Sequence, residues 1–201
     1  MSAAVNALRR ADFAAMATWI APQSRVLDLG CGDGTLMRAL QDELGVTGYG
    51  VDIADANIHA ALQNGVNVIQ CNMEDGLSMF GDQSFDTVIL SATLQAMHRS
   101  KAILEEMARV GREGIVSFPN FGFKENREQV ARGRMPVSRE LPYQWHDTPN
   151  IHLCTMDDFE ELAREIGLTI RARLAFTGDA QVDDDPNLNG ALAVYRFRRG
   201  G

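Results

Sequence analysis

Residues 25–35 of this 201-residue chain read RVLDLGCGDGT, a stretch that predicts a buried strand running into a glycine-rich turn. The segment from Arg25 to Leu29 is typical of a short strand, and the segment from Leu36 to Leu44 is typical of the helix that follows. Glycine adopts positive φ and has no side chain, so the backbone of such a turn can approach a ligand closely. We therefore expect a ligand site at this turn, although an ordinary tight turn would also use glycines.

The spacing of the glycines separates two classes of nucleotide-like ligand. Dinucleotide sites carry G-x-G-x-x-G, with the pyrophosphate on the helix N-terminus. Here the spacing is G-x-G-x-G, Thr35 stands where that pattern has its last glycine, and Asp28 lies two residues before the first one. This pattern resembles motif I of the class I S-adenosylmethionine (SAM) methyltransferases. A carboxylate beside the turn suits the ammonium group of SAM.

A second acidic residue follows at the expected distance. Asp52 ends the predicted strand over residues 47–52, about 20 residues after the glycines, where an acid accepts hydrogen bonds from both ribose hydroxyls. Each hydrogen bond to a charged acceptor contributes about 1.5–3 kcal/mol, so removing this carboxylate should weaken binding strongly. The alternative interpretation is that Asp52 caps the helix that begins near Ala54.

A third strand end carries a departure from the family pattern. Asn72 stands where the methyltransferases usually have an aspartate that binds the adenine amino group. An amide oxygen accepts the same hydrogen bond without charge. Met73 either covers the adenine ring or packs in the core.

The pattern over residues 84–91 resembles strand four of the same family, whose carboxyl end lies beside the sulfonium. The resemblance implies that Leu94, Gln95 and Met97 line the path to a methyl acceptor. It further implies SAM or S-adenosylhomocysteine as the ligand, bound by Asp28, Gly30, Cys31, Gly32, Gly34, Asp52, Ile53, Asn72, Met73 and Ser91.

Composition restricts the partners. The net charge of −8 argues against a nucleic acid, although residues 124–139 form a local basic cluster that is either solvated surface or a contact for an acidic partner. No apolar run approaches the roughly 20 residues needed to cross a bilayer, and no signal segment is evident, so we expect no membrane association and a cytoplasmic location. Cys31, Cys71 and Cys154 lack C-x-x-C spacing, which argues against both a disulfide framework and a metal site.

Strand and helix patterns alternate from Arg25 to Phe118, and two alternating segments near the C-terminus follow them. We expect an α/β, Rossmann-like class I methyltransferase fold in one domain, residues 1–201, with a mostly parallel seven-stranded sheet and an antiparallel C-terminal strand. Residues 119–152 break the pattern after the carboxyl end of a strand. We name them the lid segment, because insertions of this length at this place are usually functional.

The whole chain resembles the MetW family of methionine-biosynthesis proteins, on the glycine turn and on residues 116–122, 132–137 and 141–152. The last two stretches are not part of general methyltransferases. The resemblance implies a SAM-binding protein that works with a homoserine O-acyltransferase, acetyl- or succinyl-transferring. It leaves the oligomeric state open, including a homodimer.

Two functions remain. The favoured one is an accessory or regulatory subunit, with Tyr143 and Trp145, residue types enriched in interface hot spots, on its contact surface. The alternative is an active SAM-dependent methyltransferase that acts on a small molecule. Candidates for its general base are proposed by location only, and each could equally be structural: His98, Tyr143, His146, Asp147 and His152.

Overall fold

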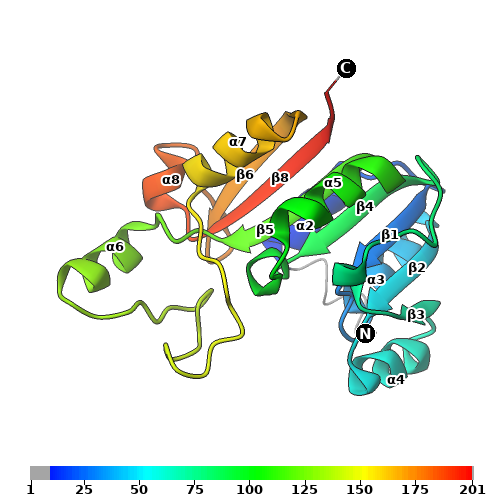
Figure 1. The fold of residues 1–201 in the computed structure, drawn as a ribbon, viewed down its shortest axis with the longest axis horizontal. Helices are drawn as coiled ribbons and strands as arrows, with labels where there is room; N and C mark the ends of the chain where they lie inside the picture. Colours follow the sequence, from blue (N-terminus) through cyan, green and yellow to red (C-terminus); the bar gives the residue numbers. More distant parts are fainter. Residues whose placement is uncertain (1–9, 201) are drawn as a thin grey trace.

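The computed structural model describes residues 10–200, which form a single sheet covered by helices on both faces (Figure 1). The strands are β1 (Arg25–Leu29), β2 (Thr47–Asp52), β3 (Val68–Gln70), β4 (Phe85–Ser91), β5 (Gly111–Pro119), β6 (Leu168–Thr177), β7 (Ala180–Gln181) and β8 (Leu192–Arg199). The α-helices are α2 (Ala11–Thr18), α3 (Thr35–Leu44), α4 (Asp55–Gln63), α5 (Ser100–Val110), α6 (Lys124–Ala131), α7 (Met156–Glu165) and α8 (Pro186–Asn189), with 3-10 turns η1 (Met73–Asp75) and η2 (Leu94–Ala96).

The strand order is β3-β2-β1-β4-β5-β8-β6-β7, and β1 to β5 pair in parallel. β8 lies antiparallel between β5 and β6, which confirms the predicted C-terminal reversal. The described sheet has eight strands rather than the seven predicted, because the two-residue β7 adds an edge strand next to β6. The chain leaves β1 toward one sheet edge and β4 toward the other. Ligands of open α/β sheets bind outside the carboxyl ends of strands at such a reversal.

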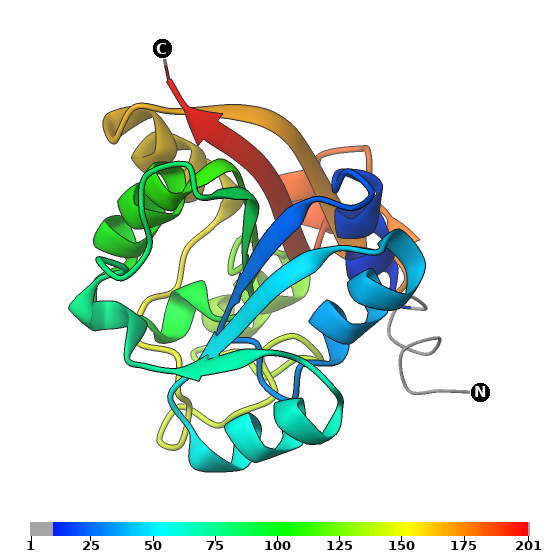
Figure 2. The same ribbon diagram turned by 90° about the vertical axis from the view of Figure 1, so that its right-hand side faces the viewer.

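The two faces of the sheet bury separate apolar clusters, and Figure 2 shows the helices that lie over these faces. Successive residues of β4 alternate between them: Ile89 packs with α2 and α3, whereas Val88 and Leu90 pack with α5 and α7. This alternation follows from the two-residue period of a strand. Each fully buried aliphatic side chain contributes about 1.5–3 kcal/mol, so both helix layers are held by burial.

The sequence predicts a helix that Thr155 caps, with Asp158 in its first turn, and that ends at Gly167. Thr155 and Asp158 form a capping box at the start of α7, and Gly167 follows its end with φ +72°. A leading helix is predicted over residues 5–20. The structure places α2 within that range, and residues 5–9 lie outside the described part of the chain.

Both ends of the lid segment are fastened to one residue, Gln95 in η2. Its side-chain Nε2 donates to the carbonyl oxygen of Pro119 at 2.7 Å. The backbone carbonyl oxygen of Gln95 accepts from the backbone N–H groups of Ile151 (2.8 Å) and His152 (3.0 Å). Between these points the segment contains α6 and then irregular chain that projects from the sheet (Figure 1). The segment is therefore a closed loop with a common anchor.

Asn120, directly after β5, fixes the start of that loop to α8. Its side chain is fully buried, donates to the carbonyl oxygens of Asn187 (2.9 Å) and Gly190 (2.7 Å), and accepts from the N–H of Gly122 (3.0 Å). The sequence 116–122, which carries part of the family resemblance, thus contains a structural anchor.

Replacing this anchor should destabilise the fold. Asn120→Ala leaves buried backbone groups without partners, at about 1–3 kcal/mol each, so we expect the free energy of unfolding in urea to fall by roughly 2–4 kcal/mol. The control is Gln63→Ala, which removes an exposed amide at the end of α4. A change at Asn120 no larger than at Gln63 would contradict this role.

Candidate functional site

The glycine turn after β1 uses its glycines for different reasons. Gly30, Gly32 and Gly34 all have positive φ, at +67°, +56° and +75°. A Cβ at Gly34 would lie 2.9 Å from the side chain of Val66, so this glycine allows close packing. A Cβ at Gly32 would meet no atom within 4 Å. Gly32 thus turns the backbone while leaving open space above it, as a ligand-contacting glycine must.

Asp52 at the end of β2 ties this turn to the neighbouring strand. Its carboxylate is 6% exposed and accepts from the N–H of Gly32 at 2.9 Å, from the N–H of Ala54 at 2.9 Å and from Nδ2 of Asn57 at 3.1 Å. A carboxylate offers about four lone-pair positions, so about one remains for a ligand hydroxyl. The N-cap of α4 is Ala54, which makes no side-chain cap bond, and Asp52 supports the start of that helix through the N–H of Ala54 and Nδ2 of Asn57.

Asp28 lies within β1, and its carboxylate is close to that of Asp52 beside the glycine turn. It is 2% exposed, and burial, followed by the nearby Asp52 charge, raises its pKa to about 7. Neither a hydrogen bond nor a cation among the described residues opposes this effect. Two buried acids without a countercharge form a site that favours a cationic ligand.

A pocket of about 370 Å³ opens over this turn. This is within the range of small-molecule sites. Of the predicted site residues, Asp28, Gly30, Cys31, Gly32 and Ser91 line it. The structure also brings Asp52 to its edge through the hydrogen bond with Gly32.

Cys31 and Ser91 have modest roles. Burial, and then the Asp28 carboxylate, raise the pKa of the Cys31 thiol to about 12, so this residue is a small neutral filler rather than a nucleophile. Ser91 at the end of β4 shares a hydrogen bond of 3.1 Å with the hydroxyl of Ser117.

Five predicted site residues do not line this pocket: Asp52, which only borders it, and four others that lie elsewhere. Gly34 faces Val66, and Ile53 is 61% exposed on the surface after β2. The side chain of Asn72 accepts from the N–H of Glu74 and caps η1, while Met73 is 8% exposed and packs in the core. The packing interpretation of Met73 therefore fits the structure better than an adenine cover.

Three residues that complete the pocket wall were not predicted from the sequence. Arg10 and Phe13 reach it from the start of α2, and Ala92 reaches it from the end of β4. Ala92 has φ +51°, a strained conformation for alanine that is typical of functional strand ends. No motif marks Arg10 or Phe13. Ala92 could have been found as the residue after a strand end at the chain reversal.

The general-base candidates do not converge on the pocket. His98 contacts Glu74 (3.1 Å), His152 contacts the carbonyl oxygen of His98 (3.3 Å), and the other three lie in the lid segment. The expected acceptor path is also absent from this pocket wall, because Leu94 and Met97 pack in the core and Gln95 anchors the lid segment.

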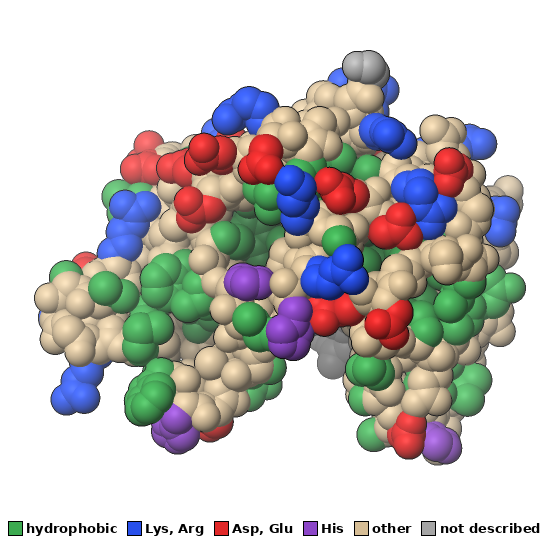
Figure 3. All heavy atoms as spheres, in the orientation of Figure 1, with side chains coloured by type: hydrophobic (Ala, Val, Ile, Leu, Met, Phe, Trp, Pro, Cys, Tyr) green, Lys and Arg blue, Asp and Glu red, His purple; other side chains and the backbone are tan. Residues whose placement is uncertain are grey.

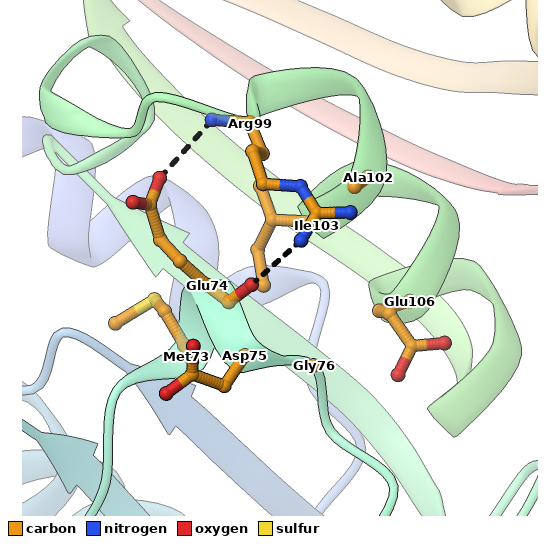
Figure 4. Close-up of a pocket in the computed structure, with 8 residues that line it drawn as sticks. All are labelled: Met73, Glu74, Asp75, Gly76, Arg99, Ala102, Ile103 and Glu106. Carbon is orange, nitrogen blue, oxygen red and sulfur yellow. Dashed lines mark hydrogen bonds between the residues drawn. The ribbon is translucent and has the colours of Figure 1, made fainter.

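A smaller pocket of about 140 Å³ lies between η1 and α5 (Figure 4). Glu74 and Arg99 close one side of it, since the Glu74 carboxylate accepts from the N–H of Arg99 at 3.0 Å. It is too small for a nucleoside ligand and contains none of the glycine turn. No group of three or more His, Cys, Asp or Glu side chains within residues 10–200 could hold a metal ion. No helix in the same range is long and apolar enough to cross a membrane.

The raised pKa of Asp28 predicts a pH-dependent stability difference. In the unfolded chain this group titrates near pH 4, so between about pH 4 and 7 the folded state binds a proton that the unfolded state lacks, and stability falls as pH rises. Asp28→Asn removes this penalty. We expect the variant to gain stability over the natural chain, on the order of 4 kcal/mol above pH 7, and to gain little near pH 4.

Thermal unfolding at pH 4.5 and pH 8 measures this difference. The control is Asp147→Asn, an exposed carboxyl in the lid segment, for which no such dependence is expected. An equal effect of Asp28→Asn at both pH values would contradict the assignment.

Solved structures share this fold at low sequence identity. A SAM-dependent methyltransferase from Archaeoglobus fulgidus superposes with a TM-score of 0.73 over 96% of this chain and 93% of that one, at 15% identity. The magnesium protoporphyrin IX methyltransferase from Synechocystis, with bound SAH, gives 0.66 over 95% and 83%, at 20% identity.

Comparison with related sequences identifies the family of this chain. A bifunctional methionine biosynthesis protein MetXA/MetW from Rhodopirellula baltica is 39% identical over 88% of this chain, and the match spans 30% of that relative's length. A demethylmenaquinone methyltransferase from Bacillus licheniformis is 30% identical over 76% of this chain and 73% of its own length. The family model described as methionine biosynthesis protein MetW matches residues 10–197, and the chain belongs to the MetW family.

Proposed function

We propose that this chain binds SAM or S-adenosylhomocysteine in the glycine-turn pocket and serves as an accessory or regulatory subunit of a homoserine O-acyltransferase. The observation that carries the second part is the relative from Rhodopirellula baltica, whose name joins MetXA and MetW in one polypeptide. Parts of one polypeptide act at high effective concentration. In place of such a fusion, this chain forms a complex with a separate acyltransferase.

The charges of the pocket support SAM over other nucleotides. Asp28 and Asp52 are two buried acids beside the turn, and they would repel the pyrophosphate of a dinucleotide. SAM carries an ammonium and a sulfonium group. Asp28 would hold the ammonium, the open face at Gly32 would admit the ligand, and Asp52 would accept a ribose hydroxyl.

The surface of the lid segment supports the proposal that this chain binds a protein partner. It exposes six large apolar side chains: Val130 (47%), Met135 (51%), Val137 (38%), Tyr143 (48%), Trp145 (72%) and Ile151 (45%); Leu153 (40%) follows directly after it. Single exposed apolar residues are ordinary, but a concentration of them in one projecting segment is typical of an interaction surface. Figure 3 shows hydrophobic side chains gathered over this region.

A methyltransferase acting on a small molecule is the second candidate. A polar space of about 330 Å³ adjoins the glycine-turn pocket and shares Arg10 and Ala92 with it, so an acceptor could lie next to bound SAM. SAM supplies an already activated methyl group, so the chain would mainly need to position the acceptor. The lack of converging bases in the pocket is compatible with such a role only for an acceptor that needs no deprotonation.

The ligand assignment is tested by Asp52→Ala. Losing a charged acceptor costs about 1.5–3 kcal/mol per hydrogen bond, so SAM affinity measured by calorimetry should fall by at least tenfold, below detection for weak binding. Asp42→Ala on the exposed side of α3 is the control and should bind normally. Unchanged affinity in Asp52→Ala would refute the pocket.

The accessory role is tested with the homoserine O-acyltransferase of the same organism. Mixing the two purified proteins should give a complex by size-exclusion chromatography and raise the acyl-transfer rate. SAM turnover to S-adenosylhomocysteine is followed in parallel with a small-molecule extract. The absence of both a complex and a rate change would refute the accessory role, and turnover in that case would favour the methyltransferase.

A further inference from the structure

A second large hollow shares no lining residue with the glycine-turn pocket. Its volume is about 380 Å³, and α5, α7, η2 and the end of the lid segment surround it. The walls are apolar, formed by Leu94, Cys154, Phe159 and Leu162. Figure 3 shows a recess with hydrophobic walls near the centre of the molecule. The hollow is separate from the proposed SAM pocket, and the side chains that pack against the sheet leave it open.

One polar atom in its wall has no partner. Gln95 is 3% exposed, and its Oε1 accepts no hydrogen bond within the described residues. The orientation of the amide is set by Nε2, which donates to the carbonyl oxygen of Pro119; exchanging the two atoms would bring two oxygens together. Buried acceptors are nearly always satisfied in folded proteins. An N–H or O–H group that enters the hollow could supply the missing donor after a small adjustment of Gln95.

The rim carries positive charge on a chain whose net charge is −8. Arg99 lines the rim, and within residues 10–200 its guanidinium forms no ion pair and donates only to the carbonyl oxygen of Glu74 at 3.4 Å. Lys101 lies beside it, paired with Glu165. The acidic member of the rim, Asp158, is engaged in the capping box of Thr155. An occupant with acidic groups next to an apolar one therefore complements the hollow.

The hollow is continuous with the exposed part of the lid segment. His152 and Cys154 line it, whereas Ile151 and Leu153, which alternate with them along the chain, are 45% and 40% exposed. An apolar cavity next to exposed apolar side chains is the arrangement of a hot-spot pocket, where one anchor residue is buried and surrounding contacts exclude water.

We infer that this hollow receives an apolar anchor side chain, flanked by acidic residues, from the homoserine O-acyltransferase partner. This inference rests on the proposed function and adds the place of contact. The anchor fills the space between Phe159 and Leu162, an N–H of the partner donates to Gln95 Oε1, and its acidic neighbours meet Arg99.

The test uses two variants that change the hollow in independent ways. Cys154→Trp fills it from within, and Arg99→Glu reverses the charge of its rim. The matched control is Arg198→Glu, which reverses an exposed arginine near the C-terminal end of β8. Affinity for the purified acyltransferase is measured by biolayer interferometry, and SAM affinity by calorimetry shows whether each variant is folded.

We expect both hollow variants to bind the acyltransferase at least tenfold more weakly, with SAM affinity within twofold of the natural chain and Arg198→Glu unchanged. If Cys154→Trp loses SAM binding as well, Arg99→Glu decides alone. If the natural chain binds the acyltransferase and the folded variants bind equally well, the hollow is not the contact, while the accessory role survives. If the natural chain fails to bind it, both proposals are overturned.

Discussion

The hydrogen bond from the Gly32 N–H to the Asp52 carboxylate, 2.9 Å long, holds the glycine turn against the neighbouring strand. Gly32 adopts φ +56° at this place, a conformation that glycine accepts without strain. The bond also fixes a negative charge near Asp28, whose own carboxylate is buried without compensation. Together with the backbone bonds from the N–H groups of Gly30 (2.8 Å) and Cys31 (3.0 Å) to the carbonyl oxygen of Val51, this contact sets the position of the turn and the charge beside the pocket.

The carboxylates of Asp28 and Asp52 lie close together at the pocket, and no cation among the described residues compensates Asp28. Arg10 reaches the pocket, but its guanidinium pairs with Asp12 at 2.6 Å and stacks over Phe13, so it does not neutralise the acids of the turn. A ligand with positive charge removes an unfavourable interaction that is already present in the free protein. Preorganised charge of this kind discriminates between ligands by the sign of their charge, which the spacing of the glycines alone does not do.

Sequence reasoning succeeded where local chemistry sets the structure. The apolar run before the glycines, the capping residues Thr155 and Asp158, and the alternating C-terminal segments predicted their elements with errors of a few residues. It was incomplete where tertiary packing decides. The two-residue β7 forms only because β6 offers it an edge, and it turned an expected seven strands into eight.

The candidate site shows the same division. The glycines and Asp28 were predictable because their backbone and charge requirements appear in adjacent residues. Met73 could cover a ligand or fill the core with the same side chain, and only the packing around η1 distinguishes the two. The contribution of Arg10 depends on how α2 approaches the sheet, which no local pattern encodes.

The attachment of the lid segment to Gln95 has an evolutionary consequence. Because both ends of residues 119–152 meet at one residue, Gln95, the length of the irregular chain between α6 and Ile151 can change without moving β4, β5 or the glycine turn. The entropy of closing such a loop grows only slowly with its length. The segment therefore behaves as an exchangeable module, and related chains can acquire new binding partners by altering it while retaining the same ligand.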